Sequence, residues 1–420
     1  MNDMTRLLMT GNGAAAWGAR LAKVEYIPAF PITPQTEIIE TLSYWIDNQE
    51  MNSKLVTLES EHSMITAAGS ASTTGVRVFT ATSSQGLLYG MEMLYAVAGW
   101  RAPIVMINVS RSLAAPISLE PDHNDILAAR DSGFLQIHCS TCQEVVDSTL
   151  IAYRLAEHKN VRLPTIVNLD GFYLSFTREP VNLPGVDAAA QFVGEFDPEN
   201  IRFQGSAPES QAVAVLGGSP YSYFRYECQL AAMKALDVYD EIADEFNKTF
   251  GRNYEAVETY QCDDAELVFF MIGCYATKAK AAVDQLRAQG WAIGLVRPRL
   301  LRPYPENHLR KALAGKKGVA IIDQNVSIGK GGILHSELAS ILYGQADAPP
   351  ILASFIGGLG GRDISPEEFY EIAKHLKHAV ETNETPKPRL LYTENELRQF
   401  KKLQSIAIVE RRELDNPQQP

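Results

Sequence analysis

Cysteines, basic charge and long apolar runs are all scarce in this sequence. Its 420 residues include five cysteines, a small and odd number that fits a reducing compartment better than a disulfide framework. Acidic residues outnumber basic ones by 50 to 38, which argues against nucleic acid or an anionic membrane as the main partner. No apolar run approaches a membrane span, and the first residues do not resemble a signal peptide. We therefore expect a cytoplasmic protein.

Short apolar segments alternate with helical patterns in the first part of the chain and again after about residue 265. Repeated strand–helix units predict parallel sheets covered by helices on both faces, so the expected fold class is α/β. The stretch between the two parts breaks this rhythm, and its amphipathic segment Leu230–Phe250 predicts one helix that packs across subunits. The charged C-terminal tail ends in NPQQP, which is typical of disorder. The expected division is 1–177, the inter-domain connection 178–264, 265–385, and the tail 386–420.

One acidic residue, Glu61, follows a short β-branched and apolar run. Leu55–Leu58 predicts a buried parallel strand, and Ser60 is a plausible N-cap of the small-residue helix that follows. Glu61 then falls in the first helical turn at the carboxyl end of a strand, where open α/β sheets bind ligands. For such an acid alone, a complement to the helix dipole would be the default interpretation.

Arg111 also comes directly after an expected strand, Pro103–Val109. A guanidinium at that place can bind a carboxylate through two parallel hydrogen bonds. An ion pair with Asp122 or Asp125 accounts for the residue equally well. The sequence alone does not decide between a substrate contact and a structural pair.

Three further motifs have both functional and structural interpretations. Gly11-x-Gly13-x-x-Ala16 matches the dinucleotide fingerprint, but the next strand ends without the acid that would bind a ribose. Close helix–strand packing, or amides that face another ligand, is the better account. Cys139 and Cys142 lack the partners of a zinc or cluster site, so they predict two buried thiols. Gly329–Gly332 could cradle a phosphate at a helix start or form a tight turn.

Several stretches taken together resemble the α subunit of 2-oxoacid:ferredoxin oxidoreductases, most closely the pyruvate-type multisubunit enzymes. The resemblance runs from about Leu7 to about Ile364. The segments that carry it are YIPAFPITPQTE (Tyr26–Glu37), LESEHS (Leu58–Ser63), FTATSSQG (Phe79–Gly86), SRSL (Ser110–Leu113), DHND (Asp122–Asp125), and DQN followed by GKGG (Asp323–Asn325 and Gly329–Gly332).

The resemblance implies an enzyme that uses thiamine diphosphate, with a pyrimidine-binding domain first and a transketolase C-terminal-like domain second. Glu61 matches the glutamate that hydrogen-bonds N1′ of the aminopyrimidine, and such a residue should be buried. Thr33 and Arg111 match groups that hold the substrate. The remaining cofactor-binding residues implied by the PITP and SSQG segments are Pro31, Ile32, Ser84 and Gln85.

Two motifs of such enzymes are absent from the chain. It has no GDG followed by an Asn-Asn pair, the usual signature for the diphosphate and Mg²⁺, and no CxxCxxC run for iron–sulfur clusters. The resemblance therefore implies a β subunit that binds the diphosphate and Mg²⁺, and γ and δ ferredoxin-like subunits that carry 4Fe–4S clusters. No metal site is expected on this chain. Coenzyme A would accept the acyl group, with ferredoxin or an NAD-reducing flavin subunit as acceptor.

The substrate and two other function classes stay open. Leu119-Glu120-Pro121 departs from the expected approach to the Asp-His pair, so a larger 2-oxoacid such as phenylglyoxylate or indolepyruvate is an alternative to pyruvate. A nicotinamide-dependent dehydrogenase that uses Gly11–Ala16 and a non-catalytic scaffold are the other hypotheses. Iron–sulfur absorption of the purified complex would favour the oxidoreductase, and tight NAD binding to the isolated chain would favour the dehydrogenase.

Overall fold

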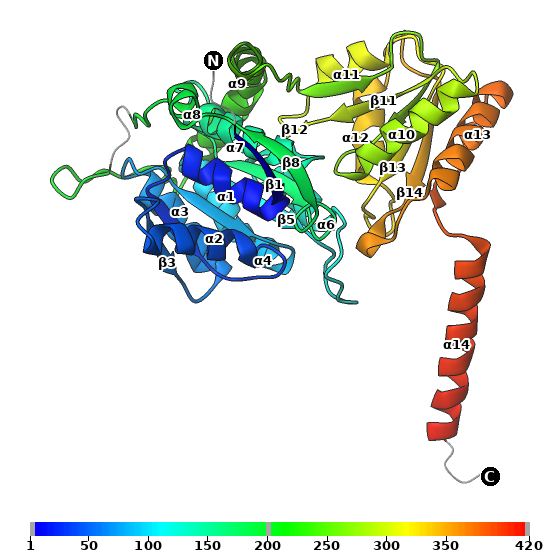
Figure 1. The fold of residues 1–420 in the computed structure, drawn as a ribbon, viewed down its shortest axis with the longest axis horizontal. Helices are drawn as coiled ribbons and strands as arrows, with labels where there is room; N and C mark the ends of the chain where they lie inside the picture. The colour runs from blue at the N-terminus through cyan, green and yellow to red at the C-terminus, as the bar shows by residue number, and fades with distance from the viewer. Residues whose placement is uncertain (1–4, 199–202, 416–420) are drawn as a thin grey trace.

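The computed structural model describes residues 5–198 and 203–415, which form two α/β domains and a projecting C-terminal helix (Figure 1). Most strand pairings in the two large sheets are parallel, so the predicted α/β class is confirmed. The terminal NPQQP, for which disorder is predicted, lies outside the described residues. No helix in the described ranges combines the length and apolarity needed to span a bilayer.

The first domain is organised around parallel strands whose carboxyl ends carry the candidate site residues. An isolated bridge between Tyr26 and Val78 joins a separate two-stranded parallel pair to the larger sheet. In spatial order the strands are β3 (Lys54–Thr57), β2 (Tyr26–Ala29), β4 (Phe79–Thr82), β5 (Val105–Ser110), β7 (Thr165–Asp170) and β6 (Leu135–His138). The helices are α1 (Gly11–Leu21), α2 (Thr36–Asp47), α3 (Glu61–Ser72), α4 (Gln85–Tyr89), α5 (Met91–Gly99), α6 (Asn124–Ala128), η1 (Ala129–Asp131) and α7 (Cys142–Glu157).

The strand before Glu61 is parallel, as predicted, but it is not buried. β3 pairs on one side only, with β2, and its residues are half-buried or exposed. An edge strand keeps one side open to solvent, although its β-branched sequence resembles that of a central strand.

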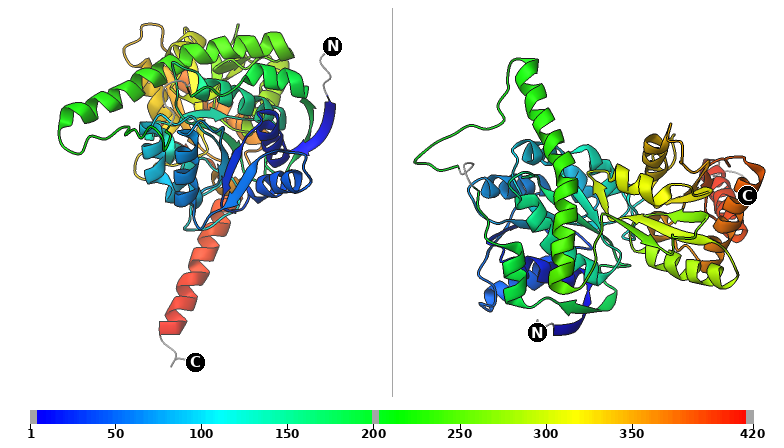
Figure 2. Two further views of the ribbon diagram at one scale, coloured as in Figure 1. Left: turned by 90° about the vertical axis from the view of Figure 1, so that its left-hand side faces the viewer. Right: turned by 90° about the horizontal axis from the view of Figure 1, so that it is seen from above.

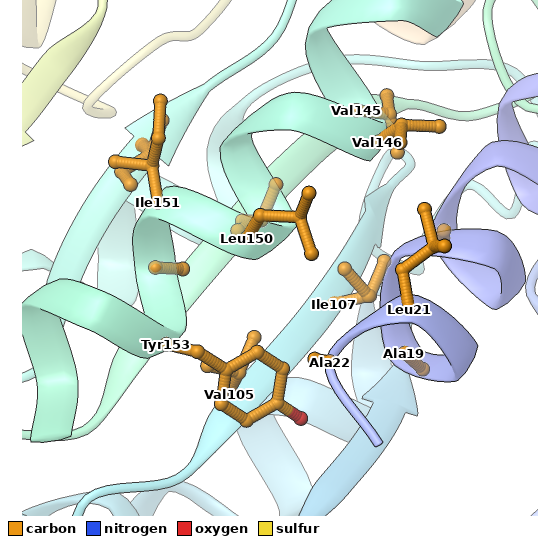
Figure 3. Close-up of a cluster of buried hydrophobic side chains, with 14 of the residues drawn as sticks. Ala19, Leu21, Ala22, Val105, Ile107, Val145, Val146, Leu150, Ile151 and Tyr153 are labelled. Carbon is orange, nitrogen blue, oxygen red and sulfur yellow. The ribbon is translucent and has the colours of Figure 1, made fainter. Parts of the chain in front are cut away.

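Helices α1 and α7 cover one face of the first sheet. Figure 3 shows side chains from both helices, among them Leu21 and Leu150, packed against Val105 and Ile107 of β5. Successive strand residues point to opposite faces, so Met106 between them packs into the cluster on the other face. That second cluster continues into the second domain through Phe270 and Val296. A continuous apolar core therefore joins the two domains.

The segment 178–264, expected to hold one helix, contains more structure. β8 (Arg178–Leu183) pairs antiparallel with β1 (Thr5–Thr10), and α8 (Val186–Val193) follows. α9 (Gly218–Phe250) is a 33-residue helix that runs along the first domain, and its N-terminal end projects beyond it (Figure 2). β8 was missed because its partner lies about 170 residues earlier, a separation at which local sequence carries no pairing signal. Packing of this segment across subunits stays a prediction.

The second domain has a mostly parallel sheet with helices on both faces. Its strands, in spatial order, are β15 (Arg389–Leu390), β14 (Ile351–Ile356), β13 (Gly318–Asp323), β10 (Leu267–Phe270), β11 (Ile293–Pro298) and the antiparallel β9 (Val257–Tyr260). Its helices are α10 (Tyr275–Ala288), α11 (Glu306–Leu313), α12 (Ile333–Leu342), η2 (Leu359–Gly361) and α13 (Pro366–Thr382). A short strand, β12 (Leu300–Arg302), leaves this domain and pairs with β6 of the first sheet.

The described part of the tail, 386–415, contains a helix that the sequence analysis did not predict. α14 (Glu394–Asp415) extends away from both domains (Figures 1 and 2). Leu397, Phe400 and Leu403 are exposed on it. Their spacing of three residues suits a helix, but the high charge of the tail obscured that pattern.

A buried ion-pair network fastens the second domain to the first. Arg297 of β11 is fully buried and donates to both carboxylate oxygens of Glu144 at 2.6 and 3.1 Å, and to Glu258 at 2.6 Å. Burial opposes ionisation of Glu144, but the guanidiniums of Arg297 and Arg299 outweigh it and hold the pKa of that carboxyl at about 2.

Glu144→Gln should destabilise the protein by about 3–5 kcal/mol at pH 7, because it leaves buried guanidinium charge without its partner. A carboxyl with a lowered pKa stabilises the fold above its ordinary pKa and loses that contribution as the pH falls through its folded pKa. The wild type should therefore lose this part of its stability between about pH 4.5 and pH 2, and the variant should not. Denaturant unfolding across that range measures both effects.

Glu371→Gln is the matched control, because Glu371 is an exposed partner of Lys374. It should change the unfolding free energy by less than about 1 kcal/mol. Equal effects of the two substitutions would contradict a fastening role for Glu144.

Candidate active site

Glu61 is the first residue of α3, as the sequence predicts. Ser60 is the N-cap, and its hydroxyl accepts a hydrogen bond from the Ser63 amide at 3.2 Å. The Glu61 side chain is buried, with 5% of its surface exposed, which confirms the burial expected of it. Glu59, two residues earlier, is exposed and bonds Ser63 instead.

The Glu61 carboxylate lies against the start of α4. A β-carbon added to Gly86 would come within 2.4 Å of Glu61 Oε1 and 2.6 Å of Thr82 Oγ1. No side chain larger than hydrogen fits at this place without displacing those groups. The close approach of Glu61, Thr82 and Gly86 therefore brings α3 together with the carboxyl end of β4.

Arg111 directly follows β5, and its side chain contacts Gln85 at the start of α4. Its Nη2 donates to Gln85 Oε1 at 2.8 Å, and its side chain is only 6% exposed. Of the two acidic residues considered as ion-pair partners, Asp125 accepts from the Arg111 backbone amide rather than from the guanidinium, and Asp122 does not contact it. Burial lowers the pKa of Arg111, and the nearby charge of Asp125 partly offsets this. In the described part of the chain no carboxylate pairs with the guanidinium.

The Thr33-Pro34 turn borders the Arg111 side of the site. A β-carbon on Gly171 would lie 3.0 Å from Pro34 Cγ and 3.7 Å from Arg111 Cβ, so both groups flank this glycine. Asn12 Nδ2 donates to the Pro34 carbonyl at 2.9 Å and fixes the turn from α1. Thr33 is exposed at its tip. The two residues before it differ: Pro31 is exposed and Ile32 is half-buried.

Ser84 precedes α4, and its backbone sets the positions of the Arg111 and Glu61 sides of the site relative to each other. Its φ of 49° lies in the left-handed region, which is costly for a residue with a β-carbon. Its amide donates to Asp125 at 3.1 Å and its hydroxyl donates to the Ser112 carbonyl at 2.9 Å. These bonds hold the strained turn that places Gln85 beside Arg111 and Gly86 beside Glu61.

Several buried polar atoms around the turn after β4 and at Arg111 have no hydrogen-bond partner within the described chain. In the described residues, Thr82 Oγ1, Ser83 Oγ, Gln85 Nε2 and Arg111 Nε are buried and make no hydrogen bond. Buried polar groups normally find partners, and a cluster of exceptions points to a ligand. Of these atoms, Thr82 Oγ1 lies beside the Glu61 carboxylate, because both would come within 2.6 Å of a β-carbon at Gly86. This set fits a polar heteroaromatic ring with an adjacent carboxylate, as the resemblance implies.

The Gly11–Ala16 motif has the predicted strand before it and helix after it, but its amides are already used. The Gly11 and Asn12 amides donate to the Leu174 and Ser175 carbonyls at 3.0 and 3.1 Å, and the Gly13 amide donates to Thr10. A pyrophosphate would find none of these three donors free. Close packing is the correct interpretation, and the structure contradicts both the nicotinamide site and a different amide-bound ligand here.

The other two motifs also have structural roles. Cys139 and Cys142 are buried at the turn from β6 to α7, as predicted, and burial raises the pKa of both thiols. At the start of α12, the Asp323 carboxylate accepts from the Leu334 and His335 amides at 2.8 and 3.3 Å. That carboxylate occupies the place where Gly329–Gly332 was considered for a phosphate. Gly332 lacks a β-carbon because one would collide with Asp323.

Within the DHND segment, Asp122 and His123 contact the second domain, whereas Asp125 bonds the backbone of Ser84 and Arg111. His123 Nε2 and Asp170 lie 2.7 Å apart and are fully buried, and the Cys274 amide of the second domain donates to Asp170 at 2.6 Å. Burial opposes a charge on His123, but the Asp170 carboxylate outweighs it and raises the pKa of the histidine. Sequence reasoning did not single out Asp170. Its position at the carboxyl end of β7 is the signal that could have identified it.

Comparison with known proteins identifies the family. Residues 17–247 match the family described as pyruvate flavodoxin/ferredoxin oxidoreductase, thiamine diphosphate-binding, and residues 265–369 match pyruvate:ferredoxin oxidoreductase core domain II. The chain belongs to this family. The predicted recognition is thereby confirmed, and the nicotinamide-dehydrogenase hypothesis has no further support.

Two relatives that are equally similar to this chain are named for different 2-oxoacids. The pyruvate synthase subunit PorA of Methanothermobacter thermautotrophicus is 39% identical over 375 residues, 89% of this chain and 96% of that protein. The ketoisovalerate oxidoreductase subunit VorA of Pyrococcus horikoshii is 39% identical over 384 residues, 90% of this chain and 96% of that protein. Overall identity therefore does not separate a pyruvate enzyme from a branched-chain one.

Solved structures of low identity support the fold. A 2-oxoglutarate:ferredoxin oxidoreductase from Magnetococcus marinus superposes with a TM-score of 0.68 at 20% identity, over 90% of this chain. This chain spans 66% of the length of that one. A split-gene transketolase gives a TM-score of 0.50 at 13% identity, over 88% of this chain and 98% of the other. At these identities the likenesses show the fold alone, a two-domain α/β arrangement that this chain shares with both proteins.

Proposed function

We propose that this chain is the α subunit of a thiamine-diphosphate-dependent 2-oxoacid oxidoreductase. The complex would convert a 2-oxoacid and coenzyme A to acyl-CoA and CO₂, and the two electrons released would pass to iron–sulfur clusters. The observation that carries the proposal is a buried Arg111 guanidinium without a carboxylate partner in the described residues, bonded to Gln85 next to the glycine that packs on buried Glu61. A buried arginine without a carboxylate is costly unless a ligand supplies one.

Each residue of the site has a distinct role in this proposal. Glu61 holds a proton at N1′ of the aminopyrimidine, and Gln85 and Ser84 form the wall of that pocket with Pro31 and Ile32. Thiamine diphosphate, when bound, supplies the carbon that adds to the 2-oxo group and takes up the electron pair left by CO₂. Arg111 binds the substrate carboxylate, and Thr33, exposed at the tip of its turn, donates to a substrate oxygen.

The rest of the site would come from partners. A β subunit would bind the diphosphate and Mg²⁺, because this sequence has no GDG motif. γ and δ ferredoxin-like subunits would carry the 4Fe–4S clusters, and ferredoxin or an NAD-reducing flavin subunit would be the acceptor. The exposed Pro31 and Thr33 of the turn beside Arg111 support a site completed by another chain.

Pyruvate and a branched 2-oxoacid are the two substrate candidates that the relatives favour. Phenylglyoxylate or another aromatic 2-oxoacid stays a third, motivated by Leu119-Glu120-Pro121. This segment contacts Gly361 of the second domain through the Glu120 side chain, and the Glu120 carbonyl accepts from the Ser112 amide at 3.1 Å, one residue after Arg111.

The complex purified through a tag on this chain should oxidise a 2-oxoacid only when coenzyme A is present. We expect CO₂ release and viologen or ferredoxin reduction with pyruvate, 2-oxoisovalerate or phenylglyoxylate, at a clearly higher kcat/KM for one of them. Loss of turnover when coenzyme A is omitted is the control. Absence of activity with every 2-oxoacid, in a complex that contains the cofactor and clusters, would contradict the proposal.

A further inference from the structure

The Asp125 carboxylate lies behind the site and touches both of its halves. It is fully buried at the start of α6. One oxygen accepts from the Ser84 amide at 3.1 Å, the Asn108 amide group at 3.1 Å and the Arg111 amide at 3.4 Å. The other oxygen accepts from the Ser110 hydroxyl and from the Ile126 amide at 2.7 Å. Four of these partners are N–H donors, and the fifth, the Ser110 hydroxyl, shares its single proton with the Asp122 carbonyl at 2.8 Å.

We propose that Asp125 is a positioning residue that fixes Arg111 and the Ser84–Gly86 turn relative to each other. The turn after β4 and the end of β5 carry opposite sides of the site, and Asp125 is bonded to the backbone of both. Ser84 is held in a left-handed conformation that an isolated serine would leave. The geometry of Asp125 is independent of the proposed function. The expected effect on catalysis rests on the proposed function.

The five donors make a carboxylate specifically necessary. Asparagine has the same shape, but one of its two terminal groups is an NH₂ donor. That group would face either the Ser84, Asn108 and Arg111 donors or the Ser110 and Ile126 donors. Either orientation leaves buried donors unpaired, and the turn can relax toward a more favourable φ.

Displacement of the turn moves Gln85, which is the partner of the Arg111 guanidinium at 2.8 Å. It also moves Gly86, whose close contact places the Glu61 carboxylate. A shift near 1 Å at a reacting site can cost roughly 100-fold in rate. Asp125→Asn should therefore lower kcat/KM for the 2-oxoacid by about 10- to 100-fold at unchanged cofactor occupancy.

Asp147→Asn is the matched control. Asp147 is also a fully buried aspartate, and it accepts from Arg252 at 2.6 Å and Tyr254 at 2.6 Å, remote from the site in the α7 packing. It should lower the melting temperature while kcat/KM per folded complex stays within about twofold of wild type. A purely structural role of Asp125 predicts the same behaviour for both variants.

The test combines a double-mutant cycle with hydrogen exchange in the assembled complex. Asp125→Asn should cost much less in an Arg111→Lys background than in the wild type, because both act through the guanidinium. Amide exchange should accelerate in peptides that cover 82–86 and 110–112, with or without substrate. Additive losses in the cycle, or unchanged exchange in those peptides, would overturn the proposal.

Two further results keep the outcome decisive. If Asp125→Asn does not assemble, Ser110→Ala removes one donor to the same carboxylate and carries the same cycle. If the wild-type complex oxidises no 2-oxoacid, the proposed function fails, and the exchange measurement still tests the positioning role alone. In an active complex, normal exchange at 82–86 in Ser110→Ala together with additive kinetics would reject the positioning role; in an inactive complex, normal exchange alone would reject it.

Discussion

Glu61→Gln should slow hydrogen exchange at C2 of bound thiamine diphosphate by about 10²–10⁴-fold, the range associated with a positioned acid–base group. Glutamine keeps the volume that fits beside Gly86, but it cannot hold a proton for N1′. Bulk solvent has little access to this position, because only 5% of the residue is exposed. Exchange at C2 followed by NMR after acid quench in the assembled complex measures the effect, with cofactor content determined separately.

Glu59→Gln provides the matched control for this result. Glu59 lies two residues away on an exposed side and bonds Ser63. The substitution has the same chemistry and should leave C2 exchange within about twofold of wild type. Wild-type exchange in a fully occupied Glu61→Gln complex would remove Glu61 from the reaction and leave it as an acidic start of α3.

Arg111→Lys should lower kcat/KM for the 2-oxoacid by about 10- to 100-fold, equivalent to about 1.5–3 kcal/mol for one hydrogen bond to a charged group. Lysine keeps the charge but loses the planar fork that bonds Gln85 and that, in the proposed function, also binds the substrate carboxylate. Cofactor occupancy should not change. Steady-state kinetics with the preferred 2-oxoacid measures the loss, and calorimetric melting measures stability.

Arg20→Lys is the control, because Arg20 is half-buried and paired with Glu50 on the surface. It should change neither kcat/KM nor the melting temperature appreciably. A large fall in melting temperature with unchanged kcat/KM in Arg111→Lys would instead identify Arg111 as a structural residue.

The parts of the site that sequence predicted are those set by local chemistry. The N-cap preference of Ser60 and the helical pattern after it put Glu61 at the start of α3, and the structure agrees. The apolar run Pro103–Val109 likewise placed Arg111 at a strand end. Burial of Cys139 and Cys142 followed from their unsuitability for a metal site.

The parts that sequence could not predict depend on long-range contacts or on unusual backbone conformation. β12 joins the first sheet from a chain position about 160 residues after its partner β6, and no local pattern indicates that pairing. Serine has no general preference for the left-handed region that Ser84 adopts, so the geometry of its turn was not foreseeable. The guanidinium of Arg111 forms no ion pair with Asp122 or Asp125 and donates instead to Gln85 on another strand–helix turn, an arrangement that only the tertiary structure reveals.

Titration of thiamine diphosphate and Mg²⁺ tests the central claim, a site shared between this chain and a partner, most directly. Isothermal calorimetry would compare the isolated full chain with the complex reconstituted from this chain and its β subunit. The account predicts saturable, stoichiometric binding to the complex and no comparable binding to the isolated chain. Tight, Mg²⁺-dependent binding by the isolated chain would contradict it.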